Sequence, residues 1–221
     1  QALCAAVRPD GSCAAAGAPP PHYEAAPVEP DASVMAAMRP ELERVNRWRE
    51  ASLGIVLETP LARNREGLES PLGNLFADAL LAAVPDADVA IGMGARRGGL
   101  RADLPAGALT RGSLYDVFPF DNRVVRLVLT GVQLQQVLAG EVARRRRGIP
   151  SVSGVRVRVT CEADRPELEI VRSSGARIDA AETLIVATTD FFATRARFGS
   201  RATPMETTLA SAPLVRDAAA G

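Results

Sequence analysis

Strand-like and helix-like patterns follow one another irregularly along this chain. Between residues 155 and 161, apolar residues alternate with Arg or Thr, which is typical of a strand with one buried face. Between residues 72 and 83, apolar residues recur every three or four positions, which predicts an amphipathic helix that ends before Pro85. Because these patterns follow no strict strand-helix-strand rhythm, the sequence predicts an α+β fold with mixed sheets.

The same patterns predict the remaining organisation. We expect a helix over residues 31–50 with Asp31 as its N-cap, and a second helix that Thr130 and Gln133 open with a capping box. Strands are predicted at residues 53–57, 87–91, 124–129, 168–171 and 183–188. Residues 1–30 are rich in Ala, Pro and Gly, which predicts a linker. We expect residues 31–52 to form a connecting helix and residues 53–221 to form one domain.

Composition excludes several partners. The 26 basic and 26 acidic residues balance, so a bulk polyanion is not the expected ligand. The arginine run at residues 144–147 is short, contains no aromatic residue and follows a predicted helix, so we interpret it as a solvated turn and predict no nucleic-acid partner. No apolar run reaches the length of a membrane span, and we expect no membrane partner.

Residues 98–122 form the candidate ligand site. The Gly98-Gly99 pair permits close approach of backbone to a ligand, and Arg101 carries a planar set of donors suited to phosphate or carboxylate. Phe120 lies between a proline and two short polar residues, which is typical of a loop. A guanidinium and a ring together suit a nucleotide. Judged by residue type alone, Arg101 is more often a solvated turn residue and Phe120 more often a core residue.

Candidate catalytic residues are few. A dinuclear phosphoesterase centre needs several His and Asp or Asn ligands to bind two metals and activate water. This chain has one histidine, His22, within the predicted linker. The residues therefore predict neither a metal site nor a hydrolytic triad in this chain, and no cofactor.

Five ordered blocks of sequence resemble the C-terminal domain of the bacterial 5'-nucleotidase and UDP-sugar hydrolase family. They are ESPLGNLFADAL from residue 69, ADVA from residue 87, GGLRADL from residue 98, VFPFDN from residue 117 and LTG from residue 129. A weaker likeness continues to Phe191. A series of this kind is far more specific than a lone glycine motif.

The resemblance implies a four-layer α/β/β/α arrangement and a role as the substrate-binding half of a periplasmic or secreted enzyme that hydrolyses nucleotides. In that family an N-terminal metallophosphoesterase domain holds two divalent metals and the catalytic His, and the C-terminal domain rotates about an interdomain helix to bring the nucleotide to them. Residues 31–50 lie where that connecting helix is expected. The alternative is a stand-alone or degenerate nucleotide-binding module without hydrolase activity.

The resemblance also implies which residues bind the substrate. They are Arg63, Arg65, Arg101, Phe120, Asn122, Gly154 and Phe191. Arg101 matches an arginine that binds the anionic end. Phe120 and Asn122 match the Phe and Asn of Pro-Phe-Gly-Asn, which stack on the base and bond the nucleoside. Gly154 resembles a glycine whose backbone contacts the base, Phe191 matches a second ring, and the spacing of Arg63 and Arg65 secures at most one of the two.

This chain departs from the family pattern after Phe191. Where the family has two glycines and an acidic residue, this chain has Arg195, Ala196 and Arg197. Arg and Ala resist backbone angles that glycine permits, so we expect this loop to take another path. The departure favours the alternative of a degenerate module, and it leaves base preference open.

The N-terminal residues suggest export. The chain begins at Gln1 rather than Met, so we expect it to have been processed or cut from a longer product. Cys4 and Cys13 flank a turn-forming sequence, and we predict a disulfide between them, as expected in an oxidising compartment. Cys161 lies on the valine side of its strand and is predicted to remain a buried thiol.

Overall fold

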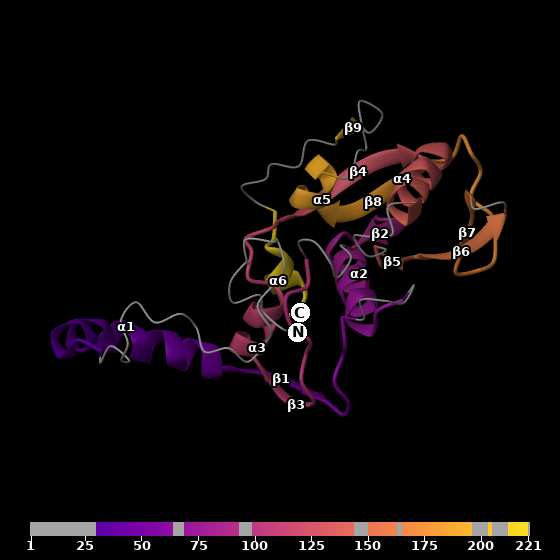
Figure 1. Cartoon of the computed structure of the whole chain (residues 1–221). Helices are drawn as coiled ribbons and strands as arrows, with labels where there is room; N and C mark the ends of the chain where they lie inside the picture. The colour runs from indigo at the N-terminus through magenta and orange to yellow at the C-terminus, as the bar shows by residue number, and fades with distance from the viewer. Residues whose placement is uncertain are drawn as a thin grey trace, which may run out of the picture. The chain divides into compact units, whose positions relative to one another are not determined.

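The structure is a computed structural model that describes residues 30–63, 69–92, 99–143, 150–162, 165–195, 203–204 and 212–220 (Figure 1). The chain divides into two compact units, residues 1–46 and 47–221. The boundary falls within helix α1 (Ala32–Glu50), so the last turn of α1 belongs to the second unit together with every other described element.

Helix α1 begins as the sequence predicts. The Asp31 carboxylate accepts hydrogen bonds from the backbone N–H groups of Ser33 and Val34, at 2.8 and 3.0 Å. These bonds, and first of all the one from the Ser33 hydroxyl, lower the pKa of Asp31 below its usual value. No residue of α1 is buried, and its apolar side chains from Val34 to Trp48 are all exposed. Within the described residues, no helix has the length and apolar character needed to cross a membrane.

A mixed five-stranded sheet forms the centre of the second unit. Its strand order is β5-β2-β8-β4-β9; β2 pairs with β8 in parallel, and the other pairs are antiparallel. The strands are β2 (Val89–Ile91), β4 (Val124–Thr130), β5 (Val152–Ser153), β8 (Thr183–Thr189) and β9 (Thr203–Pro204). All three residues of β2 are buried, whereas buried and half-buried residues alternate along most of β4. These patterns match a central strand and a strand with one covered face.

Two long helices and a short one pack on this sheet. Helix α2 (Pro71–Ala83) contacts β2, β5 and β8, and helix α4 (Gly131–Ala143) contacts β4. Ser70 caps α2 by accepting from the Gly73 N–H at 3.1 Å, and Pro71 occupies the first turn. Helix α5 (Asp190–Arg195) follows β8 directly. The core between these elements contains Leu72, Phe76, Leu80, Val89, Ile91, Leu127, Leu129, Leu134, Leu138, Leu184 and Val186.

Two antiparallel strand pairs complete the unit (Figure 1). One pairs β1 (Ser52–Leu57) with β3 (Gly107–Thr110), and the other is the hairpin of β6 (Val155–Glu162) and β7 (Arg165–Arg172). Helix α3 (Arg111–Val117) follows β3 and is held to the last turn of α1 by the ion pair of Arg49 with Asp116, at 2.8 Å. The hydrogen bond that Arg49 donates to the Asp116 carboxylate raises the pKa of Arg49 above its usual value. Helix α6 (Val215–Ala218) lies against α2.

The predicted α+β class with a mixed sheet is confirmed, as are most predicted elements. The helix at residues 131–143 has its capping box: Thr130 and Gln133 exchange hydrogen bonds of 2.7 and 3.4 Å. The predicted strand at residues 87–91 is shorter, because residue 87 donates its N–H back to Val84 in a turn. Strand β3 and helix α3 are additions to the prediction, because the sequence of residues 98–122 is typical of loops around a ligand.

Candidate functional site around Arg101 and Phe120

The turn that carries Arg101 is fixed by its neighbours. Leu100 and Leu104 are buried on either side of it, and Leu104 exchanges two backbone hydrogen bonds with Leu61, at 3.0 and 3.1 Å. The backbone N–H of Arg101 donates to the carbonyl of Val117 at 2.9 Å. The Arg101 side chain is therefore directed outward from a turn whose backbone is held on both sides.

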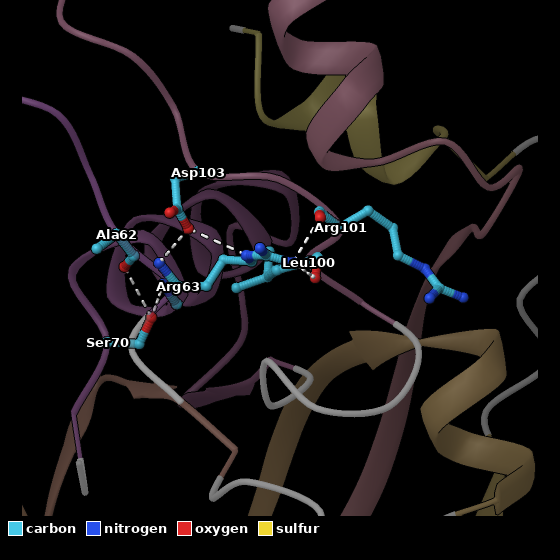
Figure 2. A network of polar contacts seen from close by, with 7 residues as sticks. Ala62, Arg63, Ser70, Leu100, Arg101 and Asp103 are labelled. Carbon is cyan, nitrogen blue, oxygen red and sulfur yellow. Dashed lines mark hydrogen bonds and ion pairs between the residues drawn. The ribbon is translucent and has the colours of Figure 1, made fainter. Parts of the chain in front are cut away.

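Arg63 lies beneath this turn and bonds to it (Figure 2). Its Nε donates to Oδ1 of Asp103 at 3.0 Å, and its NH1 donates to the carbonyl oxygens of Leu100 and Arg101. Figure 2 shows the Arg101 side chain extending away from this group of contacts. Arg63 is only 19% exposed. The structure thus places the predicted substrate-binding residue Arg63 among protein partners that define the backbone path from residue 100 to residue 103.

Phe120 is an exposed ring beside Arg101. The Cζ atom of Arg101 lies 4.9 Å from the centre of the Phe120 ring, a cation–π distance. Phe120 is 37% exposed, whereas Phe118, two residues earlier, is 5% exposed and packs on Phe76 with a centroid distance of 5.1 Å. The alternative interpretation of Phe120 as a core residue is therefore wrong, since Phe118 takes that place. The two residues most strongly implied by the motifs lie together on the surface.

The other predicted residues occupy different settings. Asn122 is half-buried, and its carbonyl accepts from the Val215 N–H at 2.9 Å. Gly154 lies between β5 and β6 with φ +81°, and a Cβ there would overlap the carbonyl oxygen of Asp88. Phe191 is half-buried against the core, within α5. Backbone geometry and space thus require glycine at position 154 whatever ligand binds.

Phe120 lies in a loop, as its sequence context predicts, whereas Phe191 lies within a helix. Phe120 follows helix α3, because Thr110 and Ser113 form a capping box that turns the chain into a helix directly after β3. Phe191 is the second residue of helix α5, since Asp190 bonds the Phe191 N–H at 2.7 Å and starts a helical turn. The implied roles of the two rings in binding the substrate stay a prediction.

Several predicted features lie outside the described residues. They are Arg65, Gly98, the arginine run at 144–147, Arg197, His22, Cys4 and Cys13. Cys161 lies in β6 as predicted, but its side chain also lies outside the description. Over the described part of the chain, no three His, Cys, Asp or Glu side chains gather closely enough to hold a metal ion.

A hollow of about 330 Å³ lies beside the Phe120 loop but does not include the predicted ligand residues in its lining. Trp48, Tyr115 and Arg216 are among its lining residues, and neither Arg101 nor Phe120 is. Trp48 and Tyr115 meet edge to face there, with ring centroids 5.8 Å apart. The ligand residues predicted from the motifs thus lie outside this hollow, and Arg101 and Phe120, from two separate sequence blocks, meet at one point on the surface.

Comparison with known proteins decides the family. The family model described as "5'-nucleotidase, C-terminal domain" matches residues 51–197, about two thirds of the chain. This chain belongs to that family. The matched range includes every predicted substrate-binding residue and all five sequence blocks.

Relatives of the 5'-nucleotidase C-terminal domain carry it within much longer proteins. The chain is 31% identical over 133 residues to the trifunctional nucleotide phosphoesterase protein YfkN of Bacillus subtilis (strain 168), covering 56% of this chain and 9% of that protein. It is 36% identical over 75 residues to endonuclease YhcR of the same organism, covering 34% of this chain and 6% of that protein. This chain therefore spans less than a tenth of each of these relatives.

A solved structure has the same fold. The 5'-nucleotidase precursor from Thermus thermophilus superposes with a TM-score of 0.68 at 23% identity. The match covers 85% of this chain and 38% of that protein. The mixed sheet with its helices is thus the fold of a 5'-nucleotidase C-terminal domain.

Proposed function

We propose that this chain is the nucleotide-binding half of a 5'-nucleotidase-type hydrolase. The observation that carries the proposal is the pairing of an exposed ring, Phe120, with an exposed guanidinium, Arg101, at 4.9 Å. The ring offers a face for a nucleobase, and the guanidinium offers charge-assisted hydrogen bonds to the anionic end. Both residues come from blocks of the matched family region.

The contact between Arg101 and Phe120 is weaker than the contacts that a nucleotide would make with the same two side chains. An exposed cation–π contact contributes about 0.5–1 kcal/mol. Stacking of a base on an aromatic ring contributes about 1–3 kcal/mol, and a hydrogen bond to a charged group about 1.5–3 kcal/mol. A nucleotide therefore offsets the loss of the Arg101–Phe120 contact, after which the base takes the ring and Arg101 turns to the phosphate.

The proposal assigns the bond-breaking step to another domain. An N-terminal metallophosphoesterase domain with two divalent metals would supply the activated water and stabilise the leaving oxygen. This chain's own residues would bind and orient the nucleotide. The 221-residue chain incubated with AMP and Mn²⁺ or Co²⁺ should release no phosphate, and turnover above a buffer control that survives repurification would contradict this division.

Titration of three ligands separates the two roles. AMP, UMP and adenosine are titrated into wild type, Phe120→Ala and Arg101→Ala by calorimetry. Phe120→Ala should weaken all three ligands about 5- to 150-fold because each base loses its stacking partner. Arg101→Ala should weaken only the two nucleotides, because adenosine carries no anionic group.

Replacing an arginine elsewhere on the surface tests whether loss of any positive charge weakens nucleotide binding. Arg177, 83% exposed on the hairpin side and paired with Glu169, gives the variant Arg177→Ala. This variant should bind all three ligands as wild type does. Equal loss of AMP and adenosine in Arg101→Ala would refute the assignment of Arg101 to the anionic end.

One observation favours the alternative of a nucleotide-binding module without hydrolase activity. Helix α5 continues through Arg195, where the family pattern has a glycine. Fusing the chain to an active N-terminal domain from a relative distinguishes the two proposals. Phosphate release from AMP by the fusion supports the hydrolase half, and binding without release supports the module.

We further propose export to an oxidising compartment. Cys4 and Cys13 would then be paired, which stabilises the small loop between them by roughly 2–3 kcal/mol. Thiol counting under denaturing, non-reducing conditions should find one free cysteine, Cys161. Three free thiols would argue against both the pairing and the compartment.

A further inference from the structure

Arg216 connects the C-terminal segment to the loop that carries Phe120. Its NH1 donates to the carbonyl oxygen of Phe120 at 3.2 Å, and its NH2 lies 2.6 Å from Oδ1 of Asp121. Its Cζ lies 5.5 Å from the centre of the Tyr115 ring. One guanidinium thus bonds a backbone oxygen and a carboxylate of the loop while resting on a ring of the preceding helix α3.

We propose that Arg216 is the positioning residue of this site, which sets the orientation of the Phe120 ring for stacking on a nucleobase. The proposal rests on the proposed function of the chain as a nucleotide-binding half. Arg216 lies beyond residues 51–197, so the family match assigns it nothing. It touches the backbone of Phe120 rather than the ring, which leaves the ring face accessible to a ligand.

The Arg216 side chain makes several contacts at once rather than a single surface ion pair. The Arg216 side chain is 18% exposed, although its partner Asp121 is 79% exposed. An ion pair with so exposed a carboxylate contributes little by itself, because water screens it. The hydrogen bond to the Phe120 carbonyl is also exposed and Tyr115 is 37% exposed, so each contact is modest, and they act together because one well-covered side chain makes both. These two contacts fix the peptide at residue 120 and with it the direction in which the ring leaves the backbone.

Backbone bonds hold the same two segments together over the residues just before Arg216. The Val215 N–H donates to the Asn122 carbonyl at 2.9 Å, and the Val124 N–H donates to the Pro213 carbonyl at 3.0 Å. Arg123 also donates from its side chain to the carbonyl of residue 212, at 2.6 Å. Arg216 therefore extends an existing pairing of residues 122–124 with residues 212–215 up to the ligand-facing ring.

One partner of Arg216, Asp121, is a residue at which this chain departs from the family motif. It stands where the Pro-Phe-Gly-Asn motif has glycine, between the predicted ring and the predicted amide. A carboxylate next to a site for an anionic ligand repels that ligand unless a cation balances it. Arg216 supplies that cation at 2.6 Å, so the pair makes an acidic residue compatible with nucleotide binding.

The test compares Arg216→Gln, Arg216→Lys and Phe120→Ala with wild type in the full chain. Adenosine and AMP affinities are measured by calorimetry, and hydrogen exchange of the peptide spanning residues 118–124 is measured without ligand. Arg216→Gln should weaken both ligands about five- to tenfold and speed exchange in that peptide. Arg216→Lys keeps the charge beside Asp121 but loses the fork of donors, so it should recover part of the affinity.

Arg172 supplies a matched control. It is 29% exposed and pairs with Asp88 and Glu182, away from the Phe120 loop. Arg172→Gln should lower stability to urea while leaving the affinities and the exchange of residues 118–124 unchanged. If Arg172→Gln weakens adenosine as much as Arg216→Gln does, the effect is general destabilisation and the positioning role is wrong.

Two failures are distinguishable. If wild type binds adenosine, Phe120→Ala does not, and Arg216→Gln binds as wild type, the positioning role is overturned while the proposed function stands. If wild type binds neither adenosine nor AMP, the proposed function is overturned. Hydrogen exchange then tests whether Arg216 holds the loop. Unchanged exchange of residues 118–124 in Arg216→Gln would overturn that role, and faster exchange would support it.

Discussion

Replacing Arg63 by Met tests whether this arginine binds the substrate itself or shapes the turn that presents Arg101. Met fills much of the space of the arginine stem and removes the guanidinium, so little packing is lost. The lost contacts are those from Nε to Asp103 and from NH1 to the carbonyl oxygens of residues 100 and 101. The backbone bond from the residue 63 N–H to Asp103, at 2.9 Å, remains in the variant.

The structure sets the size of the effect. Asp103 is 54% exposed, so its ion pair with Arg63 contributes about 0.2–1 kcal/mol. The bond to the Arg101 carbonyl has a charged donor that is 19% exposed and contributes about 1.5–3 kcal/mol. The contact with the Leu100 carbonyl, at 3.4 Å, is too long to add much. Arg63→Met should therefore lower the free energy of unfolding by about 2–4 kcal/mol.

Urea unfolding followed by circular dichroism measures this loss. The midpoint should fall with the slope unchanged, because the unfolded chain exposes the same surface. Affinity for AMP should fall as well, since the turn that directs Arg101 is loosened, whereas adenosine should bind nearly as in wild type. The control Arg158→Met removes a 78% exposed arginine from β6 and should change stability by less than about 0.5 kcal/mol.

A different result would refute this reasoning. If Arg63→Met unfolds at the same urea concentration as wild type and loses AMP binding completely, Arg63 contacts the phosphate directly. The turn would then be held by its leucines and backbone bonds alone. If the variant is destabilised and AMP binding is unchanged, Arg63 has a structural role that does not extend to Arg101.

Three further changes have defined outcomes. Phe118→Ala empties a core position and should cost about 3–5 kcal/mol in urea unfolding, whereas a cost below about 1 kcal/mol would contradict its packing on the α2 side. Gly154→Ala places a Cβ against the Asp88 carbonyl at a positive φ, and should cost about 1–3 kcal/mol in thermal unfolding. Because the pKa of Asp31 is lowered in the folded protein, Asp31 stabilises α1 above pH 3.8 and this contribution disappears as pH falls through the lowered pKa. The helical signal of Asp31→Ala should be weaker than that of wild type at neutral pH, and the difference should vanish in acid.

Local patterns predict most of the fold because they report which face of an element is buried. The alternation in β6 and the helical spacing in α2 are such patterns, and the structure confirms both elements. The Thr130–Gln133 capping box is equally visible in the sequence, since its partners are three residues apart. The matching Thr110–Ser113 box is harder to detect, because glycines and polar residues surround it and favour a loop.

Contacts between distant segments cannot be predicted in this way. The parallel pairing of Val89 with Val186 joins strands whose patterns contain no information about register. Arg101 and Phe120 are predicted because each belongs to a motif, and their 4.9 Å contact follows from the fold rather than from either motif. Arg216 escapes prediction because nothing around it in the sequence marks it, and the loop that it bonds lies far back along the chain.

The contact between Arg216 and the Phe120 carbonyl spans 96 positions of the chain, and this distance dictates an order of events during synthesis. A ribosome adding about 5–20 residues per second needs about 5–20 s to make the intervening chain. Throughout that interval the hydrophobic core around β2 and β4 has part of its sequence available, but the loop bearing Phe120 lacks its partner segment. On the proposed function, the Phe120 ring is not yet oriented during this interval, and full affinity for a nucleotide arises only once the segment around Arg216 has been made.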